Sequence, residues 1–562
     1  MSRNRLAIQT VSEGEKWMKN FRKQYGKNVC RSLLLLIAGT AVITVHAQTV
    51  KQEEKEEADL EAKRELIREI YSEEYQQEVS DRLEEAKAGG NYTEDTMLIE
   101  PNPYGTNSLS LYVYFQTKEK AQVSYTVSVE DENIADFTAD ENARLREEEL
   151  EHRETEGKTE HEFQVIGLVP DHTNTVTFTI TYADGNQVIR EYKHNPGSVS
   201  GEEEMQLEVT DAKENSEEEL SDGLYVILGN DSEGLDFMYY YDTNGVLRGE
   251  IPIIGYRSHG ILFWEECMYY SISATKIAAV NALGKVEKVY DTGTYKLHHD
   301  YTFDEEGNLI VLATDTQSNS VEDRIIRIDH ETGEITDVFD LAEVLGKYKE
   351  LLTDADTEDL DWMHINTLQW MGEQTVILSS RETSSILKIS SIFETPKLEY
   401  IIGEKGFWNG TGYEDFLLEK DESNGTFSGT GGQHTVTYET SEALEDGAYY
   451  LYMFNNNLGY SESRDYDWTQ IEGIATSIDV EAVSYYYKYL VNETEGTYEL
   501  VKSFEVPFSP YVSSAQEYDE NIIVDSGMKG IFGEYDQDGS LLRQFQMKLA
   551  DRYIYRVYKY HF

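Results

Sequence analysis

The sequence contains almost no cysteine. Only Cys30 and Cys267 occur in 562 residues, so a framework of disulfide bonds is excluded. Cys30 lies beside an N-terminal apolar segment that has the features of an export signal, and a bond between the two cysteines would have to join different compartments. We therefore predict no intrachain disulfide, and the fold must be stabilised by burial of hydrophobic cores.

Basic residues and proline are also scarce. The chain has 48 Lys and Arg against 107 Asp and Glu, which gives a formal net charge of -59. Such a surface repels nucleic acid and anionic lipid, so nucleic acid is excluded as a partner. With 8 Pro and 41 Tyr the composition favours strands over disordered linkers. The length fits two or three globular units.

Residues 1–50 are expected to be an export signal or a membrane anchor. A basic stretch (1–31) precedes an apolar run (33–45), and about 13 apolar residues suit a signal peptide better than a membrane span. Small or short residues at 45–47 suit cleavage, whereas residues 32–50 can be read as a marginal single anchor. Both outcomes stay open. In either case residues 51 onward are expected outside the cytoplasm, at the cell surface or secreted.

Three further segments precede the main domain. Residues 51–90 are rich in Glu, Lys and Arg with apolar residues three and four apart, which predicts a helical stalk ended by Gly89 and Gly90. Residues 91–197 alternate polar and apolar residues with a period of two, which predicts a small β-sandwich. Residues 198–222 are rich in Ser and Glu and are expected to form an acidic linker.

Residues 223–562 contain a degenerate repeat. A polar turn leads into a short strand six times, at 242–247, 281–286, 329–335, 395–400, 495–500 and 536–541. Their spacing is typical of the blades of a β-propeller with insertions. The sequence thus predicts a mainly β protein with a six-bladed β-propeller as its catalytic domain, although five or seven blades also fit.

The histidines identify a candidate site. Seven of the twelve are assigned to the export segment, to a charge-rich insert, to polar turns or to the C-terminus, and are expected to be solvated: His46, His152, His161, His172, His194, His330 and His561. His259, His298 with His299, His364 and His434 remain. The last three places each open a blade just before the run expected to be its innermost strand, and Arg381 ends the strand that His364 introduces. Side chains at such positions converge at the propeller axis, so we expect these histidines and Arg381 to meet there.

A metal site is disfavoured by the same residues. Three histidines could hold zinc, but Arg381 would repel a cation and would instead clamp an oxyanion. The sequence also lacks a closely spaced His-x-x-x-His motif or carboxylate pair. We therefore predict no metal ligands and no cofactor. Structural calcium in the propeller loops is left open.

Several motifs together resemble the bacterial arylsulfate sulfotransferase family. They are His299-Asp-Tyr with Gly307-Asn308, Trp362-Met-His-Ile-Asn366, residues 379–389, residues 401–408, Gly432-Gln-His434 and, at the start of the sandwich, residues 102–109. The resemblance covers about residues 90 to 560. It implies transfer of a sulfuryl group from a phenolic sulfate donor to a phenolic acceptor, without adenylyl sulfate, by a ping-pong mechanism.

The resemblance also implies residue roles. His434 matches the nucleophile that becomes a sulfohistidine, and His299, His364, Asn366 and Arg381 match groups around the sulfate. His299 is preferred over His298 by its distance from Gly307-Asn308, and His298 is kept as a substrate-binding candidate. A neutral imidazole can attack a sulfate ester if Arg381 offsets the negative charge, while His299 or His364 moves the proton. The stretch 416–433 departs from the family pattern because it contains no cysteine.

Two other functions fit the same pattern. One is a non-catalytic cell-surface propeller that binds a glycan or a protein, and the other is a metal-dependent hydrolase or lyase. The sequence does not give the natural donor and acceptor, or the oligomeric state, for which a homodimer is left open.

Overall fold

The computed structural model describes residues 55, 57–142, 157–201, 207–212, 216, 218–229, 234–352, 359–478, 480–549 and 552–562. The predicted export segment with Cys30 and His46 lies outside these residues, as does His152. Residues 67–562 form one compact unit. Among the described helices, none is both long and apolar enough to cross a membrane.

Six strands form the N-terminal domain: β1 (Leu98–Pro101), β2 (Leu111–Ser128), β3 (Phe137–Asp140), β4 (Lys158–Val165), β5 (Asn174–Tyr182) and β6 (Gln187–His194). The first half of β2 pairs with β1 and β4, and its second half pairs with β3 and β5. The long strand therefore belongs to both layers. Phe163 of β4 packs against Phe178 of β5 with ring centroids 6.3 Å apart, so the layers share one core.

Helix α2 (Glu73–Gly89) packs against this domain. Ser72 caps the helix, because its hydroxyl accepts a hydrogen bond from the Tyr75 amide. Val79 and Leu83 are buried in a cluster with Tyr112 of β2. This part of the predicted stalk is thus a packed helix, and residues 57–70 before it are also helical.

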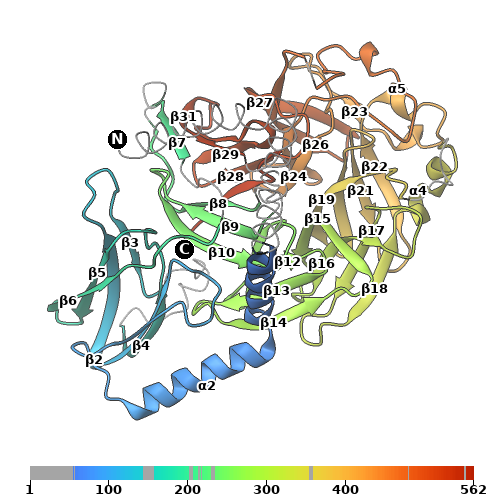
Figure 1. Ribbon diagram of the computed structural model, residues 1–562. Helices are drawn as coiled ribbons and strands as arrows, with labels where there is room; N and C mark the ends of the chain where they lie inside the picture. Colours follow the sequence, from blue (N-terminus) through green and yellow to red (C-terminus); the bar gives the residue numbers. More distant parts are fainter. Residues whose placement is uncertain are drawn as a thin grey trace, which may run out of the picture. The chain divides into compact units, whose positions relative to one another are not determined.

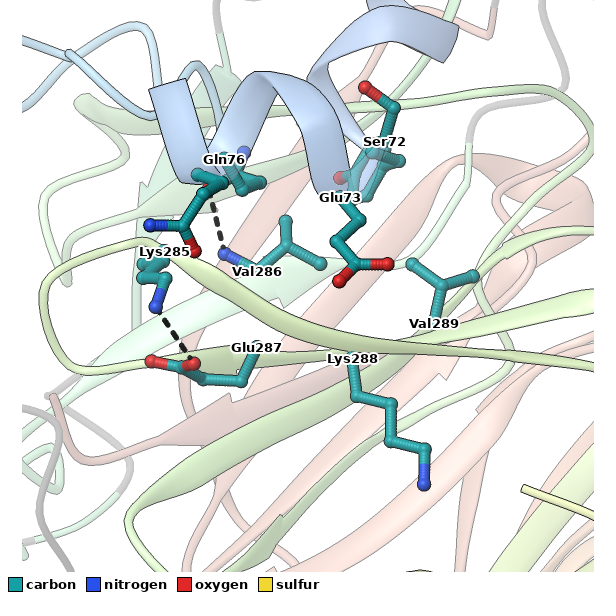
Figure 2. Close-up of a pocket in the computed structure, with 10 residues that line it drawn as sticks. Ser72, Glu73, Gln76, Lys285, Val286, Glu287, Lys288 and Val289 are labelled. Atoms are coloured by element: carbon teal, nitrogen blue, oxygen red, sulfur yellow. Dashed lines mark hydrogen bonds and ion pairs between the residues drawn. The ribbon is translucent and has the colours of Figure 1, made fainter. Parts of the chain in front are cut away.

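Polar contacts join α2 to strand β14 (Val286–Asp291) of the propeller. The Gln76 side chain accepts a hydrogen bond of 3.0 Å from the Val286 amide. Beside this contact lies a cavity of about 530 Å³, lined by Ser72, Glu73 and the start of β14 (Figure 2). Tyr71, just before the helix, donates to the Pro252 carbonyl at 2.6 Å. The helix is therefore fixed to both domains.

The remaining strands form six sheets, which confirms the prediction of a six-bladed propeller. Blade 1 has β8 (Leu224–Ile227), β9 (Asp236–Tyr241), β10 (Leu247–Ile253) and β32 (Val557–Tyr560). Blade 2 has β11 (Ile261–Trp264), β12 (Cys267–Ser273), β13 (Lys276–Asn281) and β14. Blade 3 has β15 (Tyr295–Phe303), β16 (Leu309–Asp315), β17 (Arg324–Ile328) and β18 (Ile335–Asp340).

Blade 4 has β19 (Ile365–Gly372), β20 (Thr375–Ser380), β21 (Ser385–Ser390) and β22 (Lys397–Ile402). Blade 5 has β23 (Glu419–Lys420), β24 (His434–Glu439), β25 (Ala448–Asn455), β26 (Val483–Asn492) and β27 (Thr497–Pro507). Blade 6 has β28 (Ser514–Tyr518), β29 (Asn521–Ser526), β30 (Ile531–Tyr535), β31 (Leu541–Met547) and β7 (Leu207–Asp211). Short helices lie between strands: α4 (Ala342–Lys349), α5 (Lys405–Trp408), η2 (Glu414–Phe416), η3 (Trp468–Gln470) and η4 (Gly527–Lys529).

The six polar turns found in the sequence occupy one equivalent position. Each connects the third strand of a blade, counted from the axis, to its fourth strand in the β-meander. In the first, the Asp242 carboxylate accepts hydrogen bonds from the amides of Asn244 and Val246, and Gly245 has a φ of 77°. A left-handed residue is needed to close such a turn, and glycine adopts that conformation without strain.

Strands from the beginning and the end of the propeller segment complete the ring of blades. Strand β32 supplies the inner strand of blade 1 by pairing with β8. Strand β7 adds an outer strand to blade 6 by pairing with β31 (Figure 1). Strand β7 lies within the segment expected to be an acidic linker (198–222). That segment therefore contributes to closure of the ring and is more than a spacer.

The strand order corrects one detail of the sequence interpretation. Strands β15, β19 and β24, which contain or directly follow the site histidines, are themselves innermost, and the runs expected to be innermost are second strands. The histidines therefore lie in, or directly before, the strand nearest the axis, and not before the second strand as the sequence interpretation implies. Arg381 follows β20, the second strand of blade 4.

Candidate active site at the propeller axis

The site histidines come from the first strands of three consecutive blades. His299 lies in β15, His364 directly precedes β19 and His434 begins β24. His299 and His364 have positive φ angles of 54° and 47°. A left-handed backbone costs free energy for residues other than glycine, and such strain is concentrated at functional sites.

The rings of His299 and His364 face each other with centroids 4.9 Å apart. Glu322, from the loop between β16 and β17, contacts both: its carboxylate lies 3.2 Å from Nε2 of His299 and 2.9 Å from Nδ1 of His364. The two imidazoles hold the pKa of this carboxyl well below its usual range although burial opposes its charge. Glu322 is thus an anion between two histidines.

His364 has a second acidic neighbour. Asp361 approaches its Nδ1 to 2.5 Å. Burial disfavours the charged ring, but the carboxylates of Glu322 and Asp361 outweigh burial and raise the pKa of His364 to about 9. His364 is therefore protonated at neutral pH.

His299 has the opposite charge state. Burial lowers its pKa to about 3 despite the carboxylate of Glu322, so the ring is neutral. Its Nδ1 lies 3.0 Å from the hydroxyl of Tyr555, which precedes β32. Two histidines in contact thus differ in charge, and only His364 has a proton to give at neutral pH.

The tautomer of His434 follows from its contacts. Its Nδ1 faces the Gly432 carbonyl at 2.9 Å and Oδ1 of Asn456 at 2.7 Å. The Asn456 amide nitrogen donates to the carbonyls of Ser509 and Val512, which fixes Oδ1 toward the imidazole. Both partners of Nδ1 are acceptors, so Nδ1 carries the proton and Nε2 keeps its lone pair.

His434 is also neutral and shielded. It is 3% exposed, and burial together with the nearby imidazole of His299 lowers its pKa well below the usual value. Among the described residues Nε2 makes no hydrogen bond. The arrangement presents a neutral imidazole nitrogen with a free electron pair.

Asn366 and Arg381 both belong to blade 4 and have different partners. The Asn366 side chain donates to the Gln433 carbonyl at 2.7 Å, directly before His434. The Arg381 amide donates to the His364 carbonyl at 3.1 Å. Its guanidinium lies 3.7 Å from Asp361 and 3.6 Å from Glu382, which are ion-pair distances without a hydrogen bond. Its N–H groups thus remain available to an anion.

Arg556 was missed by sequence reasoning. It is 2% exposed and donates to the backbone carbonyls of His259 and Asn366, at 3.1 and 2.9 Å. It directly precedes β32, the inner strand of blade 1. The position just before an innermost strand, which identified the histidines, would therefore have identified this arginine too. Glu322, Asp361 and Asn456 lie in loops or at a strand end, where the sequence shows no such pattern.

Two other histidines, His259 and His161, are also buried, and each has a polar partner of its own. His259 is 1% exposed and contacts the Ser271 hydroxyl at 3.3 Å through Nδ1. His161 was expected to be solvated, but it lies in β4 with 0% exposure and contacts Glu141 at 2.8 Å. That expectation was wrong because the charge-rich insert ends before His161, and the strand there faces the domain core.

Comparison with known proteins matches this architecture. The family described as Arylsulfotransferase (ASST) matches residues 209–556, and the Arylsulfotransferase Ig-like domain matches residues 98–197. The chain belongs to the arylsulfotransferase family. Membership supports aryl sulfotransferase activity, phenolic substrates and a location outside the cytoplasm, and it confirms the resemblance found in the sequence. This arylsulfotransferase matches no curated protein.

Solved structures similar to this arylsulfotransferase share little sequence with it. BamB from Moraxella catarrhalis is 9% identical, with 63% of this chain and 94% of that chain covered at a TM-score of 0.29. The WD40 domain of Toxoplasma gondii coronin is 10% identical, covering 61% and 77% at a TM-score of 0.30. AztD from Citrobacter koseri is 9% identical, covering 78% and 98% at a TM-score of 0.27.

Proposed function

We propose that this arylsulfotransferase moves a sulfuryl group from a phenolic sulfate ester to another phenol by a ping-pong mechanism, with His434 as the nucleophile. The observation that carries the proposal is the contact of His434 Nδ1 with two acceptors, Gly432 and Asn456. This contact leaves Nε2 unprotonated at a buried, neutral imidazole. A neutral nucleophile avoids repulsion by the sulfate anion.

In the first half-reaction the Nε2 lone pair attacks the sulfur atom of the donor. An N–S bond forms and the bond from sulfur to the phenolic oxygen breaks, so the leaving oxygen takes the electron pair. His364 supplies a proton to this oxygen, because it is protonated at neutral pH and borders the site. The products are a free phenol, a sulfohistidine at His434 and a neutral His364.

In the second half-reaction the acceptor phenol enters the same place. Neutral His364 takes its hydroxyl proton, and the phenolic oxygen attacks sulfur. The N–S bond breaks and its electron pair returns to Nε2. Donor and acceptor are both phenols, so one proton carrier serves both directions, and the enzyme is restored without a cofactor.

Arg381 is assigned to the nonbridging oxygens of the sulfuryl group. Its guanidinium makes no hydrogen bond among the described residues, yet Asp361 and Glu382 hold it at 3.7 and 3.6 Å. Preorganised cations of this kind stabilise a transition state more than mobile ones. Asn366 donates to the Gln433 carbonyl, so it is assigned to positioning the strand that carries His434.

The proposal is tested by looking for the covalent intermediate. The protein is mixed with 4-nitrophenyl sulfate without an acceptor, digested, and the peptide that contains His434 is weighed by mass spectrometry. We expect one added sulfuryl group on that peptide in the wild type and in His259→Phe, a control for a buried histidine near the axis. Modification of another residue, or turnover by His434→Ala, would refute the role of His434.

A further inference from the structure

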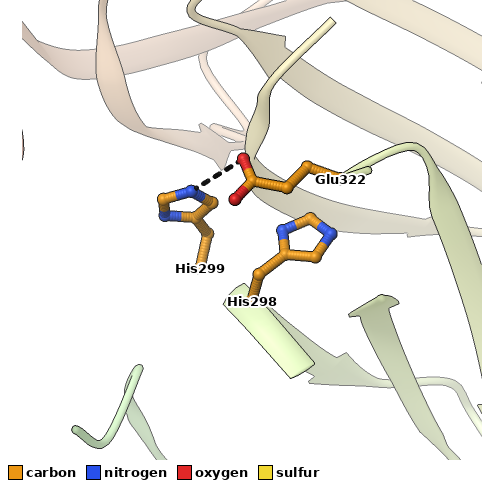
Figure 3. A group of neighbouring side chains, drawn as sticks. All are labelled: His298, His299 and Glu322. Atoms are coloured by element: carbon orange, nitrogen blue, oxygen red, sulfur yellow. Dashed lines mark hydrogen bonds and ion pairs between the residues drawn. The ribbon is translucent and has the colours of Figure 1, made fainter. Parts of the chain in front are cut away.

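A second cluster borders the proposed reaction site. One ring nitrogen each of His298 and His299 and one carboxylate oxygen of Glu322 lie within 4.8 Å of one another (Figure 3). Nε2 of His299 and Oε2 of Glu322 are 3.2 Å apart. Ligands at about 2.0–2.2 Å from a tetrahedral zinc ion are separated by roughly 3.3 Å, so this pair has the spacing of two metal ligands.

His298 provides an independent observation. It is 6% exposed, and neither of its ring nitrogens has a hydrogen-bond partner in the part of the chain that the structure describes. The Ala313 backbone lies near the ring but does not meet the geometry of a hydrogen bond. Buried polar atoms are nearly always satisfied, so an unpartnered imidazole beside a carboxylate indicates a ligand. The proposed sulfuryl transfer gives this side chain no step.

We propose that His298, His299 and Glu322 bind a divalent transition-metal ion of the zinc class, and that the bound ion inhibits the enzyme. Two imidazoles and one carboxylate suit Zn²⁺, whereas Mg²⁺ and Ca²⁺ prefer oxygen ligands. Binding through Nε2 of the neutral His299 ring requires its single proton to stand on Nδ1, which faces the Tyr555 hydroxyl, so this ring loses no proton to solvent. The ion would also withdraw Glu322 from His364. The inhibition rests on the proposed function, and the binding does not.

The objection raised from the sequence was the charge of Arg381. In the structure this guanidinium lies between two acidic side chains, Asp361 and Glu382, which offset its field. Glu322 also supplies the carboxylate that no sequence motif indicated. A neighbouring group, Glu322 with Asp361 and His364, is less suited, because Nδ1 of His364 already lies 2.5 and 2.9 Å from the two carboxylates.

Metal binding can be measured without turnover. The full chain is treated with a chelator and titrated with Co²⁺, whose visible absorption reports imidazole ligands, and with Zn²⁺ by calorimetry. We expect one equivalent bound. His298→Phe keeps a ring of similar shape but has no ligand atoms. Removal of a group that only hydrogen-bonds to a metal ligand typically costs about 10–100-fold in affinity, so loss of the ligand itself should cost at least as much. Glu322→Gln should weaken it similarly.

His561→Ala is the control, because this histidine is exposed and its side chain faces Asp519, which is not part of the cluster. It should bind as the wild type does. Thermal unfolding of each variant shows whether it is folded. Absence of a Co²⁺ spectrum in the wild type, or unchanged affinity in both folded His298→Phe and Glu322→Gln, would overturn the site.

Inhibition is tested on the same samples. Zn²⁺ should suppress release of 4-nitrophenol over the concentration range in which it binds, and excess chelator should restore the rate. In His298→Phe the residual rate should become insensitive to that concentration. Full turnover by a Zn²⁺-saturated enzyme would overturn the inhibition. No turnover by metal-free protein would instead count against the proposed function.

Discussion

His434 donates its Nδ1 proton to Oδ1 of Asn456, 2.7 Å away. This bond fixes which ring nitrogen keeps its lone pair. In Asn456→Ala the ring keeps only the Gly432 carbonyl as an acceptor and can adopt the other tautomer. We expect kcat/KM to fall by about 10²–10⁴-fold with a small change in KM. This range covers the loss of a general base and, at its upper end, a catalytic histidine held in the wrong tautomer. Steady-state kinetics measure both constants.

The melting temperature of Asn456→Ala serves as its control, because the Asn456 amide also satisfies the Ser509 and Val512 carbonyls. A folded variant with wild-type kcat would show that Asn456 does not set the tautomer.

Arg381 is expected to act on the transition state. Arg381→Ala should remove about 2–4 kcal/mol of transition-state stabilisation, or roughly 30–1000-fold in kcat/KM, by analogy with the loss of one oxyanion donor. Arg381→Lys keeps the charge but not the planar fork, so it should recover only part of the rate. Full recovery by lysine would mean that charge alone matters.

Glu322 and Asp361 together should set the upper pH limit of the reaction through the pKa of His364. In the proposed mechanism His364 is the acid in its protonated form. Its pKa is about 9, so kcat/KM should be retained at neutral pH and fall as the pH rises through 9. In Asp361→Asn one stabilising carboxylate is lost and the fall should move to lower pH. The profiles are recorded with a chelator present, to keep metal from Glu322. An alkaline limb at the same pH in both proteins would argue against His364 as the acid.

The fold was predicted where the signal is local. The turn at Asp242 closes through bonds to residues two and four positions away, and such a turn with its glycine is readable from a few consecutive residues. Closure of the ring depends on pairing between β7 and β31, more than 300 residues apart in the chain, and the composition of residues 207–211 gives no sign of it.

The site was predicted in part for a similar reason. His299, His364 and His434 stand at one repeated position of the blade, which makes them visible as a set. Glu322 and Asp361 come from loops, where no repeat restricts the side chain. Their effect is large, since the two carboxylates raise the pKa of His364 to about 9, whereas burial lowers that of His299 to about 3 despite Glu322.

A buried ion pair connects blade 1 to blade 6. Lys559 of β32 lies 2.8 Å from Glu534 of β30, and both side chains are 0% exposed. Burial opposes the charge of both groups, but Lys559 and other hydrogen-bond donors still hold the pKa of Glu534 below its usual value. For Lys559 burial dominates and lowers the pKa. The pair is thus worth little in net terms, whereas one partner alone is costly.

Lys559→Met should therefore destabilise the protein by about 3–5 kcal/mol, and Glu534→Leu combined with Lys559→Met should recover most of this loss. Because the folded pKa of Glu534 is depressed, its contribution is present above the unfolded glutamate pKa of about 4.3 and is lost as the pH falls through the folded value. Urea unfolding at neutral pH and at pH values below 4 measures both effects. If the double variant is as unstable as Lys559→Met, the unpaired charge of Glu534 is not the cause of the loss, which then comes from packing or from the donors of Ser221, Tyr225 and Asn521 that lose their acceptor.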